Sequence, residues 1–143
     1  MIIKDIMSDQ VAYVNPDNSV VEAAQLMQKH NIGIIPVCQG ANVIGVITDR
    51  DIVVRNIAHG KNPQSTPVRD VMTSQVRAVS PEMNLHQAAE IMANNQIRRL
   101  PVVDNQRLVG MVSLGDLATE AKRDVELAKT LGEISEPSEP EKM

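Results

Sequence analysis

The sequence predicts a mixed α/β fold made of two similar halves, each with the element order β-α-β-β-α. The first observation is an internal repeat: residues 4–8 (KDIMS) match residues 69–73 (RDVMT), and this 65-residue spacing continues without a gap to Asp51 and Asp116. The second is that helical and β-branched segments recur in the same order in both halves. A half of about 60 residues buries too little surface to be comfortably stable alone. We therefore expect the halves to share one core and the functional site to lie between them.

The composition is that of a globular chain and disfavours several function classes. The 143 residues are 43% hydrophobic, which is enough for one compact domain or two fused subdomains. A net charge of -4, a pI near 5.3, one tyrosine and no Phe or Trp disfavour generic nucleic-acid binding, which uses positive charge and stacking rings. The single cysteine, the short N-terminal apolar stretch and the lack of an apolar run of about 18 residues lead us to expect a soluble, cytoplasmic protein without membrane association.

The first two elements of each half are a short extended segment and a helix. Residues 11–14 are extended and end at the turn-forming residues 15–18 (NPDN). A helix is expected over residues 20–29, because Ser19 and Glu22 have the spacing of a capping box and apolar residues recur on one face. The second half repeats this pattern.

Two β-branched runs then predict a hairpin in each half, followed by a second helix. In the first half the runs are residues 32–38 and 43–47; in the second they are residues 99–103 and 108–112. The helix of the first half, over residues 51–58, is apolar over too wide an arc for a helix with one wet face. Part of that arc is expected to meet another subunit.

The domain boundaries follow the repeat. Residues 1–61 form the first repeat, residues 62–67 (NPQSTP) a polar linker and residues 68–125 the second repeat. Residues 126–143 form a C-terminal tail. Its end, beyond Gly132, is rich in Pro and Glu and has little to bury, so we expect disorder there.

The strongest local signal is an apolar strand that ends in a hydroxyl residue, with Asp three positions later. It occurs in residues 45–51 (GVITDRD) and 110–116 (GMVSLGD). A hydroxyl at the N-cap with an acid at the third helical position is by itself a capping motif. The same geometry also suits a ligand, because free N–H groups at a helix N-terminus bind phosphate and the Asp can accept hydrogen bonds from ribose hydroxyls.

The two halves resemble the paired cystathionine-β-synthase (CBS) domains of a Bateman module, in the stand-alone bacterial form. The resemblance covers about residues 3–125. It rests on residues 5–7 (DIM), 23–27 (AAQLM), 35–37 (IPV) and 45–51, and on residues 88–92 (AAEIM), 97–104 (IRRLPVVD) and 110–116. It implies two CBS repeats related by a pseudo-twofold axis, with two packed sheets and two clefts between the repeats.

The resemblance also implies which residues line the clefts in members that bind adenosine nucleotides. One cleft has Ser113 and Asp116 at phosphate and ribose, Arg98 toward phosphate, and around the base Met111, Asn15, Val20, Ile32 and Gly33. The symmetry-related cleft has Thr48 and Asp51, with Val46, Ser80, Leu85 and Ile97 against the base. Arg50 and Arg99 are near enough in sequence to add positive charge. Because Gly33 leaves room for a base where Arg98 crowds one, we favour the cleft of Ser113 and Asp116.

The predicted function is a non-catalytic regulatory sensor. It binds an adenine nucleotide (AMP, ADP or ATP) between its repeats and signals to an unidentified protein partner in trans, as a homodimer formed through helices. Three alternatives stay open: S-adenosylmethionine as the ligand, a structural interaction module with vestigial clefts, and nucleic-acid binding through Arg50, Arg98 and Arg99.

Catalytic and metal chemistry have no recognisable machinery in the sequence. We find no paired base and nucleophile, no Gly-rich phosphate loop and no His-carboxylate cluster. Cys38 is interpreted as a small buried hydrophobic residue, and the three histidines, His30, His59 and His86, lack ligand spacing. No metal and no required cofactor are expected.

Overall fold

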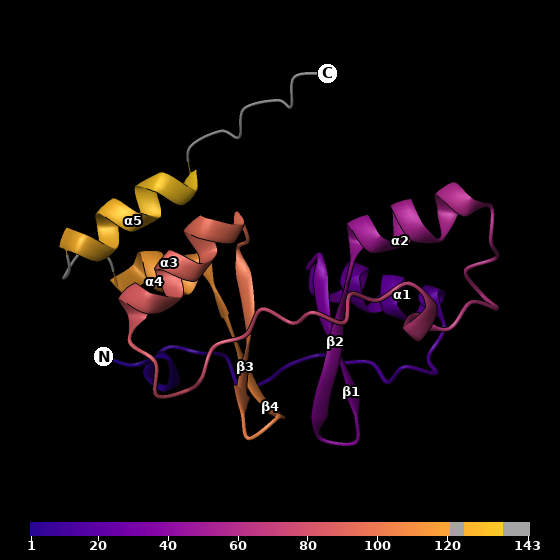
Figure 1. The fold of residues 1–143 in the computed structure, drawn as a ribbon, viewed down its shortest axis with the longest axis horizontal. Helices are drawn as coiled ribbons and strands as arrows, with labels where there is room; N and C mark the ends of the chain where they lie inside the picture. Colours follow the sequence, from indigo (N-terminus) through magenta and orange to yellow (C-terminus); the bar gives the residue numbers. More distant parts are fainter. Residues whose placement is uncertain (121–124, 136–143) are drawn as a thin grey trace.

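A four-stranded antiparallel sheet runs through the middle of the molecule, with strand order β1-β2-β4-β3 (Figure 1). The computed structural model describes residues 1–120 and 125–135. Each half contributes one hairpin: β1 (Ile34–Gln39) with β2 (Asn42–Thr48), and β3 (Arg99–Asp104) with β4 (Arg107–Ser113). Both predicted hairpins are therefore confirmed, and the helices of each half lie on the outer flank of its own hairpin.

The two hairpins join where β2 and β4 begin, beside their turns. Asn42 lies opposite Arg107, and the N–H of Val43 donates a hydrogen bond to the carbonyl of Gln106 at 2.9 Å. The strand edges pair with each other only at this end, and farther along Val46 pairs with Thr73 and Met111 with Ser8. One continuous sheet thus stands where the resemblance implied two.

The first helix of each half begins at its predicted cap. In α1 (Val20–His30), Ser19 Oγ accepts a hydrogen bond from the N–H of Glu22 at 3.1 Å, and Glu22 Oε2 accepts one from the N–H of Ser19 at 3.3 Å. Asn84 caps α3 (Leu85–Asn95) in the same way. The repeated capping box therefore sets the same helix start in both halves.

The second helix of each half starts directly after the hydroxyl residue of the motif. These helices are α2 (Asp49–Arg55) and α4 (Leu114–Glu120). The predicted helix over residues 51–58 is wrong at its C-terminal end, because α2 ends before Asn56 and the 3-10 turn η2 (Ile57–His59) follows. The carbonyl of Asn56 accepts a hydrogen bond from the N–H of Lys61 at 3.3 Å, so the chain turns back there toward the linker.

The extended segment at residues 11–14 forms a single bridge instead of a strand. Val14 pairs with Val37 in parallel: its N–H donates to the carbonyl of Pro36 at 3.1 Å, and its carbonyl accepts from the N–H of Cys38 at 2.8 Å. The turn that follows carries the chain away from β1 before a second pair can form. The second half has the equivalent single bridge.

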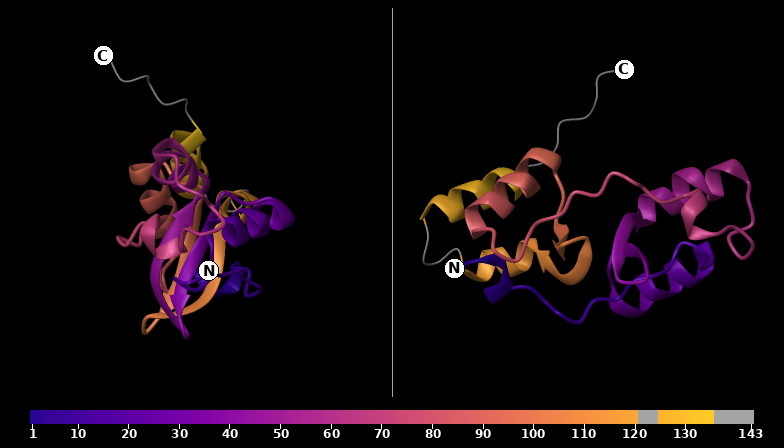
Figure 2. Two further views of the ribbon diagram at one scale, coloured as in Figure 1. Left: turned by 90° about the vertical axis from the view of Figure 1, so that its right-hand side faces the viewer. Right: turned by 60° about the horizontal axis from the view of Figure 1, so that its bottom comes forward.

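The N-terminal arm of each half packs against the other half. Ile3, in the 3-10 turn η1 (Ile3–Asp5), is fully buried in the core of the second half, and Val68, in η3 (Val68–Asp70), is fully buried in the core of the first. Figure 2 shows the indigo N-terminal segment beside the orange half before it crosses to the magenta half. The boundaries drawn from the repeat, 1–61, 62–67 and 68–125, follow the sequence, whereas the packing units exchange their arms.

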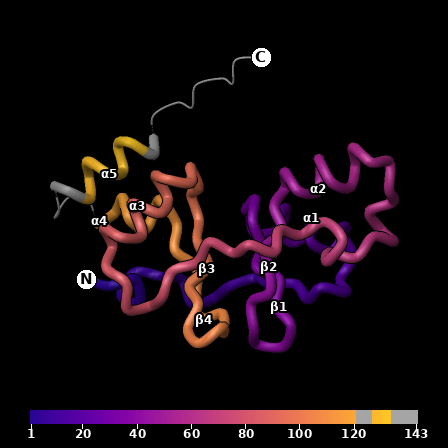
Figure 3. Tube along the Cα trace, viewed as in Figure 1, coloured from indigo at the N-terminus to yellow at the C-terminus, as the bar shows by residue number. Residues whose placement is uncertain are grey.

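Helix α5 (Val125–Ser135) lies beside α3 and α4 (Figure 3). Leu127 and Leu131 are buried in the core of the second half. The expected tail at residues 126–143 is thus helical as far as Ser135, and the predicted disorder beyond Gly132 is wrong for residues 133–135; residues 136–143 lie outside the described residues. None of the helices in the described ranges is long and apolar enough to cross a membrane.

Candidate functional site

A cleft of about 210 Å³ opens between the two halves. It is lined by side chains from the first-half segment before α1, from the end of α1 and β1, and from both strands of the second hairpin. Its apolar lining residues are Val11, Ala12, Ile32, Ile34, Pro36 and Met111, and its polar lining residues are Ser8, Gln10, His30 and Arg99. Mostly aliphatic walls with a few polar groups are typical of a small-molecule site.

The Ser113 and Asp116 motif lies next to this cleft. The N–H of Ser113 donates to Asp116 Oδ2 at 2.9 Å, and the N–H of Asp116 donates to Ser113 Oγ at 3.1 Å. Ser113 lies opposite Arg99 across the second hairpin, and Met111 is bridged to Ser8. Since Arg99, Met111 and Ser8 all line the cleft, the motif stands at its edge, with Asp116 half-buried.

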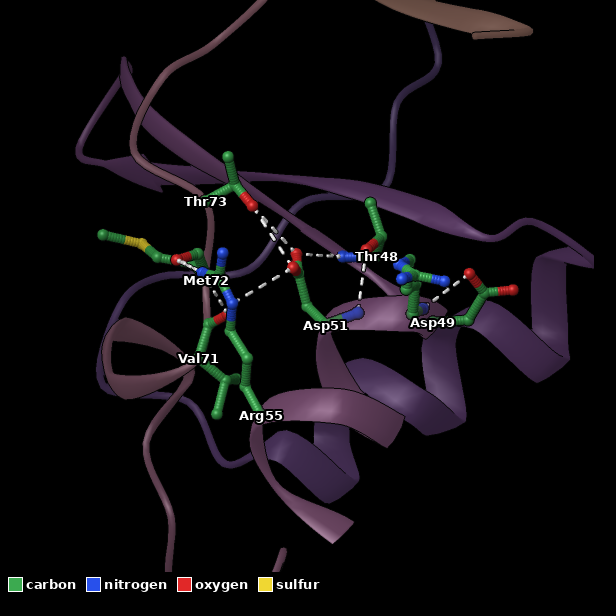
Figure 4. Close-up of polar contacts among 8 residues, drawn as sticks. Thr48, Asp49, Asp51, Arg55, Val71, Met72 and Thr73 are labelled. Carbon is green, nitrogen blue, oxygen red and sulfur yellow. Dashed lines mark hydrogen bonds and ion pairs between the residues drawn. The ribbon is translucent and has the colours of Figure 1, made fainter. Parts of the chain in front are cut away.

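The Thr48 and Asp51 motif has the same capping box and additional partners. The N–H of Thr48 donates to Asp51 Oδ2 and the N–H of Asp51 donates to Thr48 Oγ1, both at 3.0 Å. The hydroxyl of Thr73 donates to both carboxylate oxygens of Asp51, at 3.2 and 3.3 Å, as Figure 4 shows. Asp51 is only 8% exposed, so its carboxylate is closed in by the chain itself.

Arg55 completes the polar cluster around Asp51. Its Nε lies 3.8 Å from Asp51 Oδ1, and its Nη1 donates to the carbonyls of Met72 at 3.0 Å and Val71 at 3.4 Å (Figure 4). One arginine therefore contacts both the carboxylate on α2 and the backbone of the arm that enters from the linker. We call the side chains of Thr48, Asp51, Arg55 and Thr73 the Asp51 clasp.

Three of the predicted site residues line the cleft, namely Ile32, Arg99 and Met111. Arg99 lines the cleft, whereas Arg98, which the resemblance implied toward phosphate, does not. Arg98 is exposed and is absent from the lining, and its carbonyl accepts a hydrogen bond from the N–H of Leu114 at 2.7 Å. The arginine that borders the cleft is thus the one on strand β3.

Six other residues expected around the base, in one cleft or the other, are absent from this lining. Val20, Val46 and Leu85 have buried side chains that belong to the hydrophobic core, and Ile97 packs against the second core. Ser80 is exposed. Asn15 is also exposed, and its Oδ1 accepts hydrogen bonds from the N–H groups of a turn. None of these six side chains is in the lining of the 210 Å³ cleft; four of them, Val46, Ser80, Leu85 and Ile97, were expected at the symmetry-related cleft instead.

Two further predicted residues, Gly33 and Arg50, have local roles beside α2. A Cβ on Gly33 would lie 3.0 Å from Asp49 Oδ2, so this glycine makes room for a carboxylate of its own half. Arg50 is exposed, and its N–H donates to Asp49 Oδ1 at 2.8 Å.

Seven lining residues were not among the predicted site residues: Ser8, Gln10, Val11, Ala12, His30, Ile34 and Pro36. Strand alternation is the signal that leads to two of them, because side chains two positions apart lie on one face of a strand and Ile34 and Pro36 continue the series that starts at Ile32. Ser8 reaches the cleft only through the exchanged arm, which leaves no trace in the repeat pattern.

Cys38 and the histidines do not form a metal centre in the part of the chain that the structure describes. No group there of three or more His, Cys, Asp or Glu side chains is placed to hold a metal ion. Cys38 is 2% exposed, and burial raises the pKa of its thiol. The interpretation of Cys38 as a small core residue is confirmed.

Comparisons with known proteins agree with this architecture. The family model of the CBS domain matches residues 3–56 and 68–123. The CBS domain-containing protein YhcV of Bacillus subtilis is 45% identical over 133 residues, which cover 93% of this chain and 94% of YhcV. Pairs of CBS domains are generally regulatory, non-catalytic modules.

Two solved structures are similar in fold and sequence. Hypoxic Response Protein I, solved with two coordinated zinc ions, has a TM-score of 0.75 and 31% identity, covering 84% of this chain and 98% of that one. The CBS domain pair of MJ0100, solved with 5-methylthioadenosine and S-adenosyl-L-methionine, has a TM-score of 0.73 and 28% identity, covering 85% of this chain and 96% of that one. This chain belongs to the CBS-domain family and is a tandem pair of CBS domains.

Proposed function

We propose that this CBS pair is a non-catalytic cytoplasmic sensor that binds an adenine nucleotide in the cleft between its halves and signals to a partner protein in trans. The observation that carries the proposal is the cleft itself, an aliphatic hollow with Arg99 in its lining and the Ser113 and Asp116 motif at its edge. A related CBS pair was solved with two adenosine compounds, and this supports a nucleoside as the ligand here.

The cleft suits the base of the ligand better than the whole nucleotide. Its volume of about 210 Å³ is below the range of about 300–1,000 Å³ that is usual for pockets enclosing a drug-sized molecule. A purine ring fits between aliphatic walls such as Ile32 and Met111, and the sugar and phosphates then extend to the rim. Asp116 is the acceptor that we propose for the ribose hydroxyls.

Charge at the rim favours phosphate over the alternative ligand. Arg99 is a permanent cation with a planar donor group that matches phosphate oxygens, and His30 adds a second nitrogen donor to the same lining. S-adenosylmethionine carries a positive sulfonium where a nucleotide carries a negative phosphate, so Arg99 repels the one and attracts the other. AMP, ADP and ATP are therefore our ligands of choice, ahead of S-adenosylmethionine.

Signalling requires that the ligand prefer one arrangement of the two halves, because a ligand shifts an equilibrium only by its difference in affinity for the two states. The cleft is lined from both halves, so binding there senses their relative position. The surface that we propose for dimer contact is the apolar patch of Val53, Val54 and Ile57, which are 58%, 45% and 54% exposed.

Isothermal titration of the full chain with AMP, ADP, ATP and S-adenosylmethionine tests the proposal. We expect saturable binding of at least one nucleotide, at higher affinity than S-adenosylmethionine. Lack of heat and lack of a melting shift with all three nucleotides at millimolar concentration would overturn it. Phosphate release from ATP, measured in the same samples, tests the claim that the role is not catalytic.

The apolar patch also favours a second candidate function, a structural interaction module without a ligand. In that case the melting temperature stays unchanged at saturating nucleotide, since a ligand that binds only the folded state must raise it. The titration above therefore separates the two functions.

A further inference from the structure

We infer that the two CBS repeats have different tasks: the Asp51 clasp is a structural fastening that cannot accept a ligand, and the chain binds one nucleotide, at the cleft beside Asp116. The claim about the ligand rests on the proposed function. The claim about the clasp rests on contacts within the chain alone.

The carboxylate of Asp51 is already engaged on both oxygens by its own chain. Oδ2 accepts from the N–H of Thr48, both oxygens accept from the hydroxyl of Thr73, and the guanidinium of Arg55 stands beside Oδ1. With an exposed fraction of 8%, Asp51 is almost completely closed off from solvent. A ribose would have to displace the Thr73 hydroxyl and move Arg55 away from the carboxylate.

The clasp fastens the arm from the linker to the first half. Thr73 exchanges two backbone hydrogen bonds with Val46 on β2, at 2.8 and 2.9 Å, and Val71 is 1% exposed in the first core. A Cβ on Gly45 would lie 2.8 Å from the Thr73 carbonyl oxygen, so the arm is seated directly on the strand. Asp51 and Arg55 then hold the side chain and the carbonyls of this seated arm.

The second half seats its arm in the same way but lacks the clasp. A Cβ on Gly110 would lie 2.8 Å from the Ser8 carbonyl oxygen, which matches the contact of Gly45 with Thr73. However, Glu120 stands at the position equivalent to Arg55, and the hydroxyl of Ser8, the equivalent of Thr73, donates to the carbonyl of Gln10 at 3.4 Å. A negatively charged glutamate therefore stands where a positively charged arginine would pair with Asp116.

Asp116 is consequently the available carboxylate of the pair. Within residues 1–120 and 125–135, the side chain of Asp116 accepts one hydrogen bond, from the N–H of Ser113 in its capping box, and Asp116 is less buried than Asp51. The cleft of about 210 Å³ lies beside Asp116. At the equivalent of this cleft, Arg77 stands where Ala12 lines the open one, and its longer side chain leaves less room.

Titration calorimetry and native mass spectrometry of the full chain with AMP, ADP and ATP test the inference. Asp51→Ala and Asp116→Ala are matched variants, because each loses the same capping hydrogen bond and only the first breaks the clasp. We expect one nucleotide per chain. Asp116→Ala should lower the nucleotide affinity tenfold or more, whereas Asp51→Ala should keep it within about twofold of the parent. Without ligand, Asp51→Ala should melt at a lower temperature than Asp116→Ala.

Each other outcome counts against a stated part of the inference. Two nucleotides per chain, or an equal loss of affinity in both variants, overturns the unequal clefts. Equal melting temperatures of the two variants overturn the clasp. If the parent protein binds none of the three nucleotides, the proposed function and the claim about the ligand fail together. The melting temperatures of the two variants then still test the claim that the clasp is structural.

Discussion

The hydroxyl of Thr73 donates a hydrogen bond to the carboxylate of Asp51, 22 positions away in the chain, at 3.2 Å to Oδ1. This contact joins the N-terminal arm of the second repeat to helix α2 of the first. It occurs on a carboxylate that is almost completely buried, where a lost donor is costly because water cannot replace it.

Replacing this donor is expected to destabilise the fold. Thr73→Val keeps the shape of the side chain and removes the hydroxyl, so Asp51 loses one hydrogen bond, and the free energy of unfolding should fall by about 1–3 kcal/mol. Urea denaturation measures it. Ser8→Ala is the control at the equivalent position, where the hydroxyl contacts a nearby carbonyl and not a buried carboxylate; an equally large loss in the control would contradict this account.

Arg99 and Arg98 form a matched pair for the charge of the cleft. Arg99→Ala should weaken ATP binding more than adenosine binding, because only ATP carries phosphates for the guanidinium to contact. Arg98→Ala removes the same charge from a neighbouring side chain outside the cleft lining and should leave the ratio of the two affinities within about twofold of the parent. Calorimetric titration with both ligands gives this ratio, and equal effects of the two variants would speak against the placement of the phosphates.

Two glycine substitutions are expected to have opposite effects on stability. Gly45→Ala places a Cβ 2.8 Å from the carbonyl oxygen of Thr73, so the arm or the strand must shift and the protein should lose about 1–3 kcal/mol of stability. Gly132→Ala, in helix α5 with nothing within 4 Å of the added Cβ, should gain about 0.5–1 kcal/mol. Melting curves of both variants test this, and a neutral Gly45→Ala would mean that the arm is loosely held.

Helix α5 is expected to stabilise the second half through its buried leucines. Leu127 is 1% exposed in the second core, so Leu127→Ala should cost about 2–5 kcal/mol. Lys129→Ala, two positions along the same helix and exposed, should stay within about 0.5 kcal/mol of the parent. Chemical denaturation distinguishes this from a helix that rests on the surface without packing, for which both variants would behave alike.

The apolar patch on α2 and η2 can be tested by its effect on mass in solution. Val54→Asp introduces a charge into the patch and should shift the protein from dimer to monomer in light scattering after size-exclusion chromatography. Tyr13→Asp changes another exposed side chain, 57% exposed and outside the patch, and should leave the mass unchanged. A monomeric parent protein would rule out the proposed dimer.

The parts of the fold that local chemistry decides could be predicted from the sequence. The capping box of Ser19 and Glu22 and the β-branched runs around Gly40 act over a few residues, and their elements are found where expected. The exchanged arms could not be predicted, because Ile3 and Val68 have the same neighbours in sequence whichever half they pack on. The helical part of α5 shows only two buried leucines, which is too short a pattern to distinguish it from a tail.

The candidate site was only partly predictable for a related reason. The capping motif indicates both Asp51 and Asp116, but the residue that closes off Asp51, Thr73, comes from the other repeat. Arg98 and Arg99 are adjacent in sequence, but only Arg99 belongs to strand β3 and lines the cleft.

The exchange of arms makes each half depend on the other for its hydrophobic interior. Cutting the chain at the linker would separate each hydrophobic core from the arm that completes it, because that arm belongs to the other fragment. Neither fragment would then have a complete core. The two repeats must consequently melt in a single cooperative transition. A ligand bound between the repeats therefore stabilises both of them, even when it occupies a single pocket.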